Sequence, residues 1–270
     1  MNHFERHMVD LLLRARNQHG VLGIKAEFEA EGTRPDELLR LLNITHKAGL
    51  KVALKIGGCE AVSDLMSSRL YGADYVIAPM VETPYALSKF IDAKDKVYPD
   101  SAFTKFLFNV ETDTTLRSLP EMLRIAKRGV DGIVFGRVDF TCSRGMPRQS
   151  VNDRSITDAV MEVAAACART NLEFVVGGSV STAAIDVLRE VRTIRLDRFE
   201  TRKVIFDGAA IESASIDTGI ALAVEFELTW LKSKRDYYSR IAAEDDARIE
   251  MMEARARLAL SNPSRHLKTA

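Results

Sequence analysis

Short apolar runs alternate with amphipathic segments along most of the chain, and two neighbouring runs end in a carboxylate. Residues 106–112 and 132–139 are apolar runs of the kind that forms strands buried on both faces, and they carry Glu111 and Asp139 near their ends. Between them, residues 115–128 place apolar side chains at helical spacing. The pattern predicts a strand, a helix and a second strand, with an acid at the C-terminal tip of each strand.

The same alternation continues from residue 21 to about residue 206, with no sign of a domain boundary. The expected strands are residues 21–28, 52–56, 73–80, 106–112, 132–139, 174–176 and 199–206. A chain of 270 residues has the typical length of a (β/α)8 barrel, so we expect an α/β fold of this TIM-barrel class. The pattern shows only seven strands, and we expect the eighth to be missing, degenerate or hidden near the N-terminus.

A doubly wound open sheet is the competing fold, but its Gly-x-Gly-x-x-Gly phosphate-binding sequence is absent. Residues 137–153 are expected to form a long loop, and a loop of that length inside a compact unit is usually functional. The barrel is expected to occupy residues 1–216.

The remaining residues, 217–270, have a different pattern. Residues 217–261 contain no proline, and apolar side chains recur at mostly helical spacing among many charges. This pattern predicts a C-terminal helical arm that is longer than a barrel is wide. We expect the arm to pack on a sister subunit in a homo-oligomer, with a solvated extension as the alternative.

Composition narrows the class of protein. The 38 basic and 38 acidic residues cancel, so no overall field favours nucleic acid or an anionic membrane as a partner. The three cysteines are far apart, which is typical of a reducing compartment. No signal-peptide pattern or membrane-length apolar segment is present, and we expect a cytoplasmic protein.

The two strand-tip acids are the first candidates for chemistry. Active sites of parallel barrels lie at the C-terminal ends of the strands, so Glu111 and Asp139 are expected to be neighbours at such a site. Two carboxylates open to water suit a hard divalent cation such as Mg²⁺, which keeps positions free for a substrate. Equally, both acids could begin loops or cap the following helices.

Three segments together resemble a known family. Residues 78–81 (Ala-Pro-Met-Val), 109–112 (Asn-Val-Glu-Thr) and 136–140 (Gly-Arg-Val-Asp-Phe) have the order and spacing found in the HpcH/HpaI aldolase and citrate lyase β-subunit family. The resemblance covers about residues 20–206. It implies a barrel that binds Mg²⁺, Mn²⁺ or another divalent metal. In such barrels the metal chelates pyruvate or a similar 2-oxo acid and stabilises the enolate formed when a carbon–carbon bond breaks or forms.

The resemblance also implies roles for individual residues. Glu111 and Asp139 would be the metal ligands, and Gly136 and Arg137 would offer backbone N–H groups to the substrate carboxylate. Asn109 stands where the family often has Gln, and it faces the same side of its strand as Glu111. Members of the family commonly exchange C-terminal helices between protomers in hexamers, so a hexamer or trimer is the expected assembly.

Two positions depart from the family pattern. Lys55 stands at the tip of an early strand where the family has Arg, and a lysine lacks the planar fork of a guanidinium. Ala30 stands where the family aldolases carry a His after a Glu, and that Glu matches Glu29. The base could then be Glu27, Glu29 or Glu31, or the reaction could need none.

Other interpretations remain open at this point. Lys55 could form a Schiff base in a metal-free aldolase, and Lys25 is a weaker candidate of the same kind. Arg202 could bind a distal carboxylate or phosphate of the substrate, or form a structural ion pair with Glu200 or another acid. Phosphoenolpyruvate or acyl-CoA chemistry on the same metal site, and a catalytically silent paralogue, are the alternatives to a carbon–carbon lyase.

Overall fold

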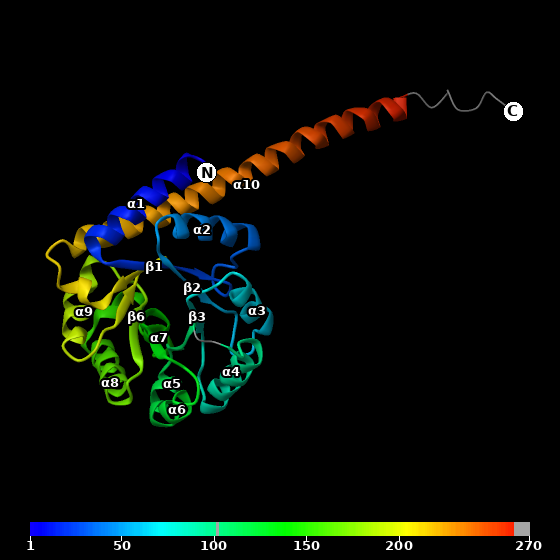
Figure 1. Cartoon of the computed structure of the whole chain (residues 1–270). Helices are drawn as coiled ribbons and strands as arrows, with labels where there is room; N and C mark the ends of the chain where they lie inside the picture. The colour runs from blue at the N-terminus through cyan, green and yellow to red at the C-terminus, as the bar shows by residue number, and fades with distance from the viewer. Residues whose placement is uncertain (101–102, 262–270) are drawn as a thin grey trace.

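Eight short strands close into a barrel in the computed structural model, which describes residues 1–100 and 103–261 (Figure 1). The strands are β1 (Val21–Glu27), β2 (Lys51–Lys55), β3 (Tyr75–Ala78), β4 (Lys105–Val110), β5 (Gly132–Gly136), β6 (Glu173–Gly177), β7 (Arg198–Glu200) and β8 (Val204–Asp207). Their side chains are mostly buried because one face fills the barrel and the other lies under helices, which explains the continuous apolar runs in the sequence. The expected barrel fold is confirmed.

The direction of β8 differs from the expected all-parallel barrel. Strands β1 to β7 run parallel to their neighbours, whereas β8 runs antiparallel to both β7 and β1. Residues 199–206, expected as one strand, therefore form a hairpin, and Thr201 Oγ1 accepts a hydrogen bond of 3.1 Å from Val204 N at its turn. The eighth strand lies in this hairpin, so of the three alternatives (missing, degenerate, or hidden near the N-terminus) the first and the last are wrong.

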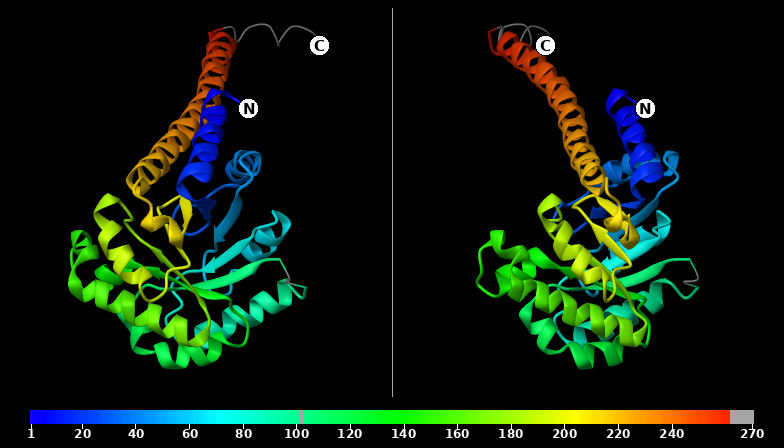
Figure 2. Two further views of the ribbon diagram at one scale, coloured as in Figure 1. Left: turned by 60° about the vertical axis from the view of Figure 1, so that its left-hand side comes forward. Right: turned by 90° about the vertical axis from the view of Figure 1, so that its left-hand side faces the viewer.

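Helices surround the barrel on its outer face (Figures 1 and 2). They are α1 (His3–His19), α2 (Pro35–Lys47), α3 (Val62–Leu70), α4 (Pro84–Val97), α5 (Asp113–Arg117), α6 (Leu119–Ala126), α7 (Arg137–Ser143), α8 (Arg154–Thr170), α9 (Ile185–Arg192) and α10 (Ile216–Ser261), with 3-10 turns η1 (Arg148–Asn152), η2 (Thr182–Ala184) and η3 (Gly208–Glu212). The expected loop at residues 137–153 is wrong in part, because α7 and η1 occupy most of it. Arg137, Phe140 and Thr141 are buried at helical spacing there, which stabilises α7 on the barrel.

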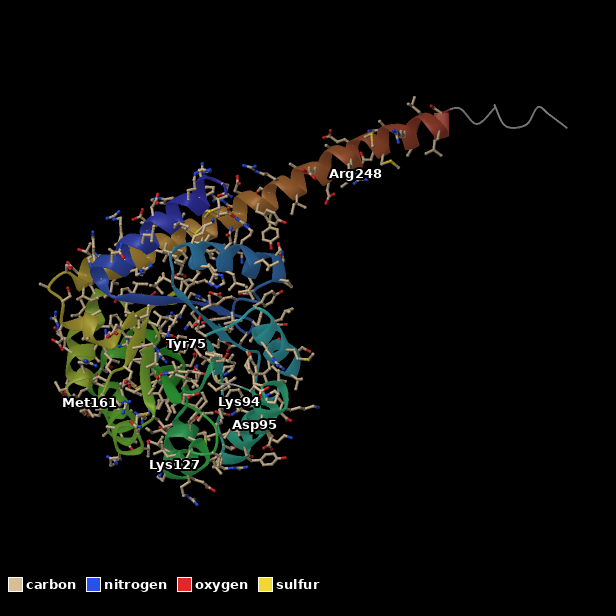
Figure 3. All side chains as sticks on the ribbon, viewed as in Figure 1. Tyr75, Lys94, Asp95, Lys127, Met161 and Arg248 are labelled. Atoms are coloured by element: carbon tan, nitrogen blue, oxygen red, sulfur yellow. The ribbon has the colours of Figure 1, made fainter. Side chains whose placement is uncertain are left out.

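The barrel interior is layered. Its middle is filled by small and medium apolar side chains from alternating strand positions, namely Ala53, Ile77, Leu107, Val134, Val175 and Ile205. At the end where the parallel strands begin, Arg198 contacts Glu173 at 2.7 Å and lies 4.2 Å from the centre of the Tyr75 ring, which is marked in Figure 3. At the other end, where β1 to β7 finish, the inward-facing positions are polar. We call this end the mouth.

The reversed β8 also sets the direction of α10. Because β8 runs away from the mouth, α10 begins at the opposite end and runs back along α1, with Glu225 Oε1 3.0 Å from His7 Nε2. At the level of the mouth, Tyr238 Oη donates to Glu37 Oε1 at 2.8 Å. Residues 239–261 continue past the barrel and are exposed, as Figures 1 and 3 show for the part that carries Arg248. The expected arm is therefore helical to residue 261, and residues 262–270 lie outside the described residues.

Across residues 1–100 and 103–261, no helix has both the length and the apolar character needed to cross a membrane.

Candidate active site

Glu111 follows directly after β4 and turns its carboxylate into the mouth. The side chain is 1% exposed. Its Oε1 accepts a hydrogen bond of 2.8 Å from Met80 N, and its Oε2 accepts one of 2.6 Å from Asn109 Nδ2. Asn109 lies two positions earlier on the same strand and so faces the same side, as expected from the alternation. Met80 adopts φ 49°, an uncommon value for a residue with a side chain, and this strained backbone presents its N–H to Glu111.

The electrostatic surroundings of Glu111 are mixed. Burial raises the pKa of its carboxyl group, and the nearby negative charge of Asp139 adds to the rise. Lys55 opposes the rise, with its Nζ 3.8 Å from Glu111 Oε2. A carboxylate held in this way costs free energy when it is ionised, and an added cation would offset that cost.

Gly136, the last residue of β5, makes room for Glu111. A Cβ atom at Gly136 would lie 2.6 Å from Glu111 Oε2 and 2.8 Å from Glu111 Cβ. The neighbouring register pairs Val110 of β4 with Phe135 of β5, which places the glycine directly beside the carboxylate. The expected importance of Gly136 therefore has a steric basis in addition to its backbone N–H.

Asp139 lies in the first turn of α7, immediately beyond the tip of β5, and its side chain is exposed. The alternative in which both acids serve the following helices fits Asp139 in part, since an acid is favourable in the first turn of a helix. It does not fit Glu111, because Thr112 caps α5 by accepting a hydrogen bond of 3.2 Å from Thr115 N.

Lys55 bridges two carboxylates at the tip of β2. Its Nζ lies 3.0 Å from Glu29 Oε2 and 3.8 Å from Glu111 Oε2. Burial works against the charge of the ammonium group, but Glu111 and Glu29 together raise the pKa of Lys55. A Schiff-base lysine must be deprotonated to attack a carbonyl, so these contacts favour an electrostatic role for Lys55.

The three glutamates left open as bases have different partners. Glu29 is the one that joins the Lys55–Glu111 cluster. Glu27 Oε1 lies 3.3 Å from Lys25 Nζ. Burial acts to raise the pKa of Glu27, but the positive charges of Lys25 and Lys55 outweigh it, so the pKa is lowered. Glu31 is bound by cations at the β7–β8 turn. Of the three, Glu29 is the one that forms an ion pair with Lys55, whose Nζ also lies 3.8 Å from Glu111 Oε2.

A second buried cluster was missed by the sequence analysis as a group. Lys25 Nζ contacts Glu200 at the end of β7, and a Cβ at Gly177 of β6 would lie 3.0 Å from Glu200 Oε1. Burial opposes the charge of Lys25, but Glu200 and Glu27 raise its pKa, so Lys25 is also a poor Schiff-base candidate. No apolar run precedes Glu200, because β7 consists of Arg198, Phe199 and Glu200, so the pattern that singled out Glu111 is lacking here.

The two arginines of the expected site have different surroundings. Arg137 is fully buried, and its guanidinium donates to Gly177 O at 3.3 Å, to Gly178 O at 2.8 Å and to Asn152 Oδ1 at 2.8 Å. Desolvation lowers the pKa of Arg137 to about 10. Its side chain thus fastens α7 to β6. Arg202 lies in the β7–β8 turn and pairs with Glu31 at 3.3 Å, instead of with Glu200.

The donor set fits a hard divalent cation. Glu111 and Asp139 supply carboxylate oxygens, and Asn109 Oδ1 is buried with no hydrogen-bond partner among the described residues. In residues 1–100 and 103–261 no group of three or more His, Cys, Asp and Glu side chains is arranged to hold a metal. A cation here would therefore depend on two carboxylates and complete its shell with substrate and water oxygens, as Mg²⁺ commonly does.

Solved structures share this fold at low sequence identity. An HpcH/HpaI aldolase from Desulfitobacterium hafniense DCB-2 is 13% identical, with a TM-score of 0.58 over 72% of this chain and 82% of that chain. An HpcH/HpaI aldolase/citrate lyase family protein from Burkholderia cenocepacia J2315 is 15% identical, with a TM-score of 0.59 over 88% of this chain and 90% of that chain. A variant of the citrate synthase SbnG is 14% identical, with a TM-score of 0.56 over 85% of this chain and 90% of that chain.

No curated protein matches the chain significantly. Residues 37–205, more than half of the sequence, match the HpcH/HpaI aldolase/citrate lyase family. This matched range begins within α2 and ends within β8, so it includes Lys55, Asn109, Glu111 and the glycine that makes room for it. The chain belongs to the HpcH/HpaI aldolase/citrate lyase family.

Proposed function

We propose that this protein is a divalent-metal-dependent carbon–carbon lyase or aldolase, or a synthase in the reverse direction, that acts on a 2-oxo acid. Membership of the family supports lyase or aldolase chemistry in general. The observation that carries the finer proposal is the buried carboxylate of Glu111, held in the mouth by Met80 N and Asn109 Nδ2 with Asp139 nearby.

Glu111 and Asp139 would hold the cation, Mg²⁺ or Mn²⁺ or another divalent metal. When bound, it would supply a fixed positive charge beside the oxygen that becomes negative as the substrate forms an enolate. Asn109 Oδ1, buried and unpartnered among the described residues, is available to accept a hydrogen bond from a bound water or substrate hydroxyl.

Lys55 and Glu29 supply charge and a proton site. The ammonium group of Lys55, held by Glu29 and Glu111, adds positive charge at the place where the substrate oxygens would bind. Glu29 is partly exposed, with 27% of its side-chain surface accessible, so it can exchange a proton with water while it remains in contact with Lys55. In this proposal Glu29 acts as the base, because Ala30 stands where the family aldolases carry a histidine.

The backbone at the start of α7 would orient the substrate carboxylate through the N–H groups of Gly136 and Arg137. Gly178 lets the turn after β6 pack closely against the start of α7, because a Cβ there would lie 2.8 Å from Arg137 N and 2.7 Å from Val138 N. Gly178 also adopts φ +83°, a conformation that a residue with a side chain rarely takes. A side chain at this position would push the start of α7 away, so Gly178 keeps the backbone there in place.

The arm of α10 supports a homo-oligomer. Beyond Arg240 it carries exposed apolar side chains on a helix without a core of its own: Ile241 (43% exposed), Ile249 (54%), Met251 (44%), Met252 (56%), Leu258 (65%) and Leu260 (82%). A helix of this kind is stabilised when a second copy covers it, since each such side chain contributes about 1.5–3 kcal/mol on burial.

Calorimetric titration with Mg²⁺ and with Mn²⁺ tests the proposed metal site. Glu111→Gln and Asp139→Asn should each weaken the affinity by about 100-fold or more, because changes to outer-shell groups alone cost about 10–100-fold. Asp158→Asn, on the outer surface of α8, is the matched control and should bind as the wild type does. Unchanged affinity in the Asp139 variant, with the fold intact by circular dichroism, contradicts the assignment.

A further inference from the structure

A cavity lies at the rim of the mouth, outside the Glu111 cluster. It has a volume of about 250 Å³ and is bounded by the loop after β1, the β7–β8 turn and the middle of α10. Its charged lining consists of Glu31, Arg202, Lys203, Glu227 and Lys234, and Trp230 and Leu231 form an apolar wall. We call this cavity the rim pocket.

The rim pocket already contains one bound carboxylate, which belongs to the chain itself. Arg202 Nε lies 3.3 Å from Glu31 Oε1, and Lys203 Nζ contacts Glu31 Oε2. The two oxygens of one planar carboxylate are thus shared between two cations. Lys203 is only 3% exposed, so its charge is held in the protein at a cost that an anion beside it offsets.

The contact between Glu31 and Arg202 leaves most N–H donors of the arginine available to a ligand. The guanidinium has five N–H donors in a fixed fork, and the contact with Glu31 is made through Nε. The Arg202 side chain is 52% exposed, so an anion from solvent can reach its outer edge. Glu31 itself stands on an irregular loop beside Gly32, which adopts φ +54° and has no atom within 4 Å of a Cβ position.

The rim pocket is adjacent to the candidate active site. Lys25 N donates to Lys203 O at 2.8 Å, and Lys25 Nζ contacts Glu200 inside the mouth. On the other side, Glu29, which pairs with Lys55, is two residues before Glu31 on the same loop. Arg202 and Lys203 are therefore connected to the Glu111 cluster through the loop that carries Glu29 and Glu31.

We propose that the rim pocket is a binding site for the terminal carboxylate of an aliphatic ligand, and that Glu31 is an internal stand-in which this carboxylate displaces. The ligand's hydrocarbon portion would lie along Trp230 and Leu231. This inference rests on the proposed function in one respect, because it identifies the ligand with the end of the second reactant farthest from the metal. Arg202 was expected from the sequence to bind a distal carboxylate or phosphate. The proposal adds Lys203 as a second cation, Trp230 and Leu231 as the apolar wall, and Glu31 as the competing carboxylate.

Glu227 fits this assignment. It faces the pocket from α10, and no ion pair to it forms within the described residues. Burial raises its pKa, while Arg202 and Lys203 oppose the rise. The two cations are thus paired with Glu31 and not with Glu227, and the contacts that Glu31 leaves are the ones that the incoming carboxylate would take.

Trp230 gives the test a direct reporter, because it is the single tryptophan of the chain and it lines the pocket. Full-length protein, free of metal and at constant ionic strength, is titrated with butyrate while Trp230 emission is recorded, and calorimetry on the same solutions measures affinity independently. Butyramide, which has the same shape without the charge, is the control ligand. Butyrate should give saturable binding, and butyramide and inorganic phosphate should bind at least tenfold more weakly.

Three variants separate the proposal from non-specific anion binding. Glu31→Gln should bind butyrate about tenfold more tightly, because an internal competitor lowers the fraction of sites that are free. Arg202→Gln should bind about tenfold more weakly, as expected for loss of a charge-assisted hydrogen bond. Arg154→Gln, a similarly exposed arginine on α8, should bind as the wild type does.

The result that overturns the proposal is the absence of saturable butyrate binding by both measurements, in the wild type and in Glu31→Gln. Equal affinity in Arg202→Gln, or phosphate binding tighter than butyrate, also overturns it. The metal plays no part in this titration, so its outcome is independent of Mg²⁺ binding at Glu111 and Asp139. A failed metal titration with a successful butyrate titration would reject the proposed function and leave the rim pocket standing.

Discussion

The carboxylate of Glu111 occupies the space that a side chain at Gly136 would fill, with 2.6 Å between Glu111 Oε2 and the position of a Cβ at Gly136. The two residues come from neighbouring parallel strands, and neither has freedom to move away. Glu111 is held by Met80 N and Asn109 Nδ2, and Gly136 is held by its pairing with Gly177. The orientation of the Glu111 carboxylate therefore depends on the absence of a side chain at position 136.

Gly136→Ala should consequently disturb the site more than the fold. The added methyl group would push the Glu111 carboxylate away from its two donors, and we expect Mg²⁺ affinity to fall by about 10–100-fold, as for other changes that misorient a ligand. Gly58→Ala is the matched control, because no atom lies within 4 Å of a Cβ there. Calorimetric titration of both variants decides the matter, and equal affinities would show that Glu111 does not bind the metal.

The raised pKa of Glu111 predicts how metal affinity depends on pH. A proton and a cation compete for this carboxylate, so affinity should fall as the pH is lowered through a pKa that burial holds above the ordinary value of 4.5. Removing the positive charge with Lys55→Met should raise that pKa further and shift the fall in affinity to higher pH. Mg²⁺ titrations between about pH 5 and pH 8 measure the shift. No shift in the Lys55 variant would mean that Lys55 does not act on Glu111.

The same pKa has a consequence for stability without metal. A carboxyl group whose folded-state pKa is raised binds its proton more tightly in the folded than in the unfolded chain, so stability rises as the pH falls through the folded pKa. Ionised Glu111 thus destabilises the metal-free protein at neutral pH. Glu111→Gln should raise the free energy of unfolding there, and the gain should shrink as the pH falls. Denaturant unfolding in the presence of a chelator measures it, with Asp158→Asn as the control.

Lys55 is expected to act through its charge. Glu111 and Glu29 keep the amine protonated, so borohydride reduction in the presence of pyruvate should leave the protein without an adduct at Lys55. Lys55→Arg should retain part of the activity and Lys55→Met should lose at least about tenfold more, since one charge near a developing oxyanion is worth a few kcal/mol. Mass spectrometry of the reduced protein is the decisive measurement, and a pyruvate-derived mass on Lys55 would establish the Schiff-base route.

The exposed end of α10 is expected to hold an oligomer together. Truncation after Ser233 would also remove Lys234 and Tyr238, which contact Glu37 of the same chain. Truncation after Arg240 keeps those contacts and removes only the exposed part of the arm. We expect light scattering to show a smaller assembly and circular dichroism to show an intact barrel. A full-length protein that is already monomeric, or an unchanged mass after truncation, would make the arm a solvated extension.

Periodicity was sufficient for the order of strands and helices, because buried strands and amphipathic helices repeat at different spacings. It failed at the β7–β8 hairpin, whose turn at residues 201–203 contains none of the Gly, Pro, Asn or Asp that usually mark a turn. It also failed within residues 137–153, where α7 is too short to show a clear helical repeat.

For the candidate site, the position of an acid at the end of an apolar run was enough to select Glu111 and Asp139. The contact between Lys55 and Glu29 could not be predicted in the same way. It depends on the irregular path of the loop after β1, and neighbouring Glu27 and Glu31 have the same chemistry. The steric dependence of Glu111 on Gly136 likewise required the register between β4 and β5.

The hairpin of β7 and β8 also determines when the barrel can close. The seam between β8 and β1 joins the two ends of the barrel sequence and consists of a few residue pairs interrupted by a shift in register. During synthesis β1 has no neighbour on that side until the hairpin has been made, so the last barrel contact to form is also the one of greatest sequence separation. Contacts of this kind slow folding because loop closure costs entropy before any pairing is gained. Until β8 has been made, the nascent barrel is therefore an open sheet, and its final hairpin turns it into a closed ring.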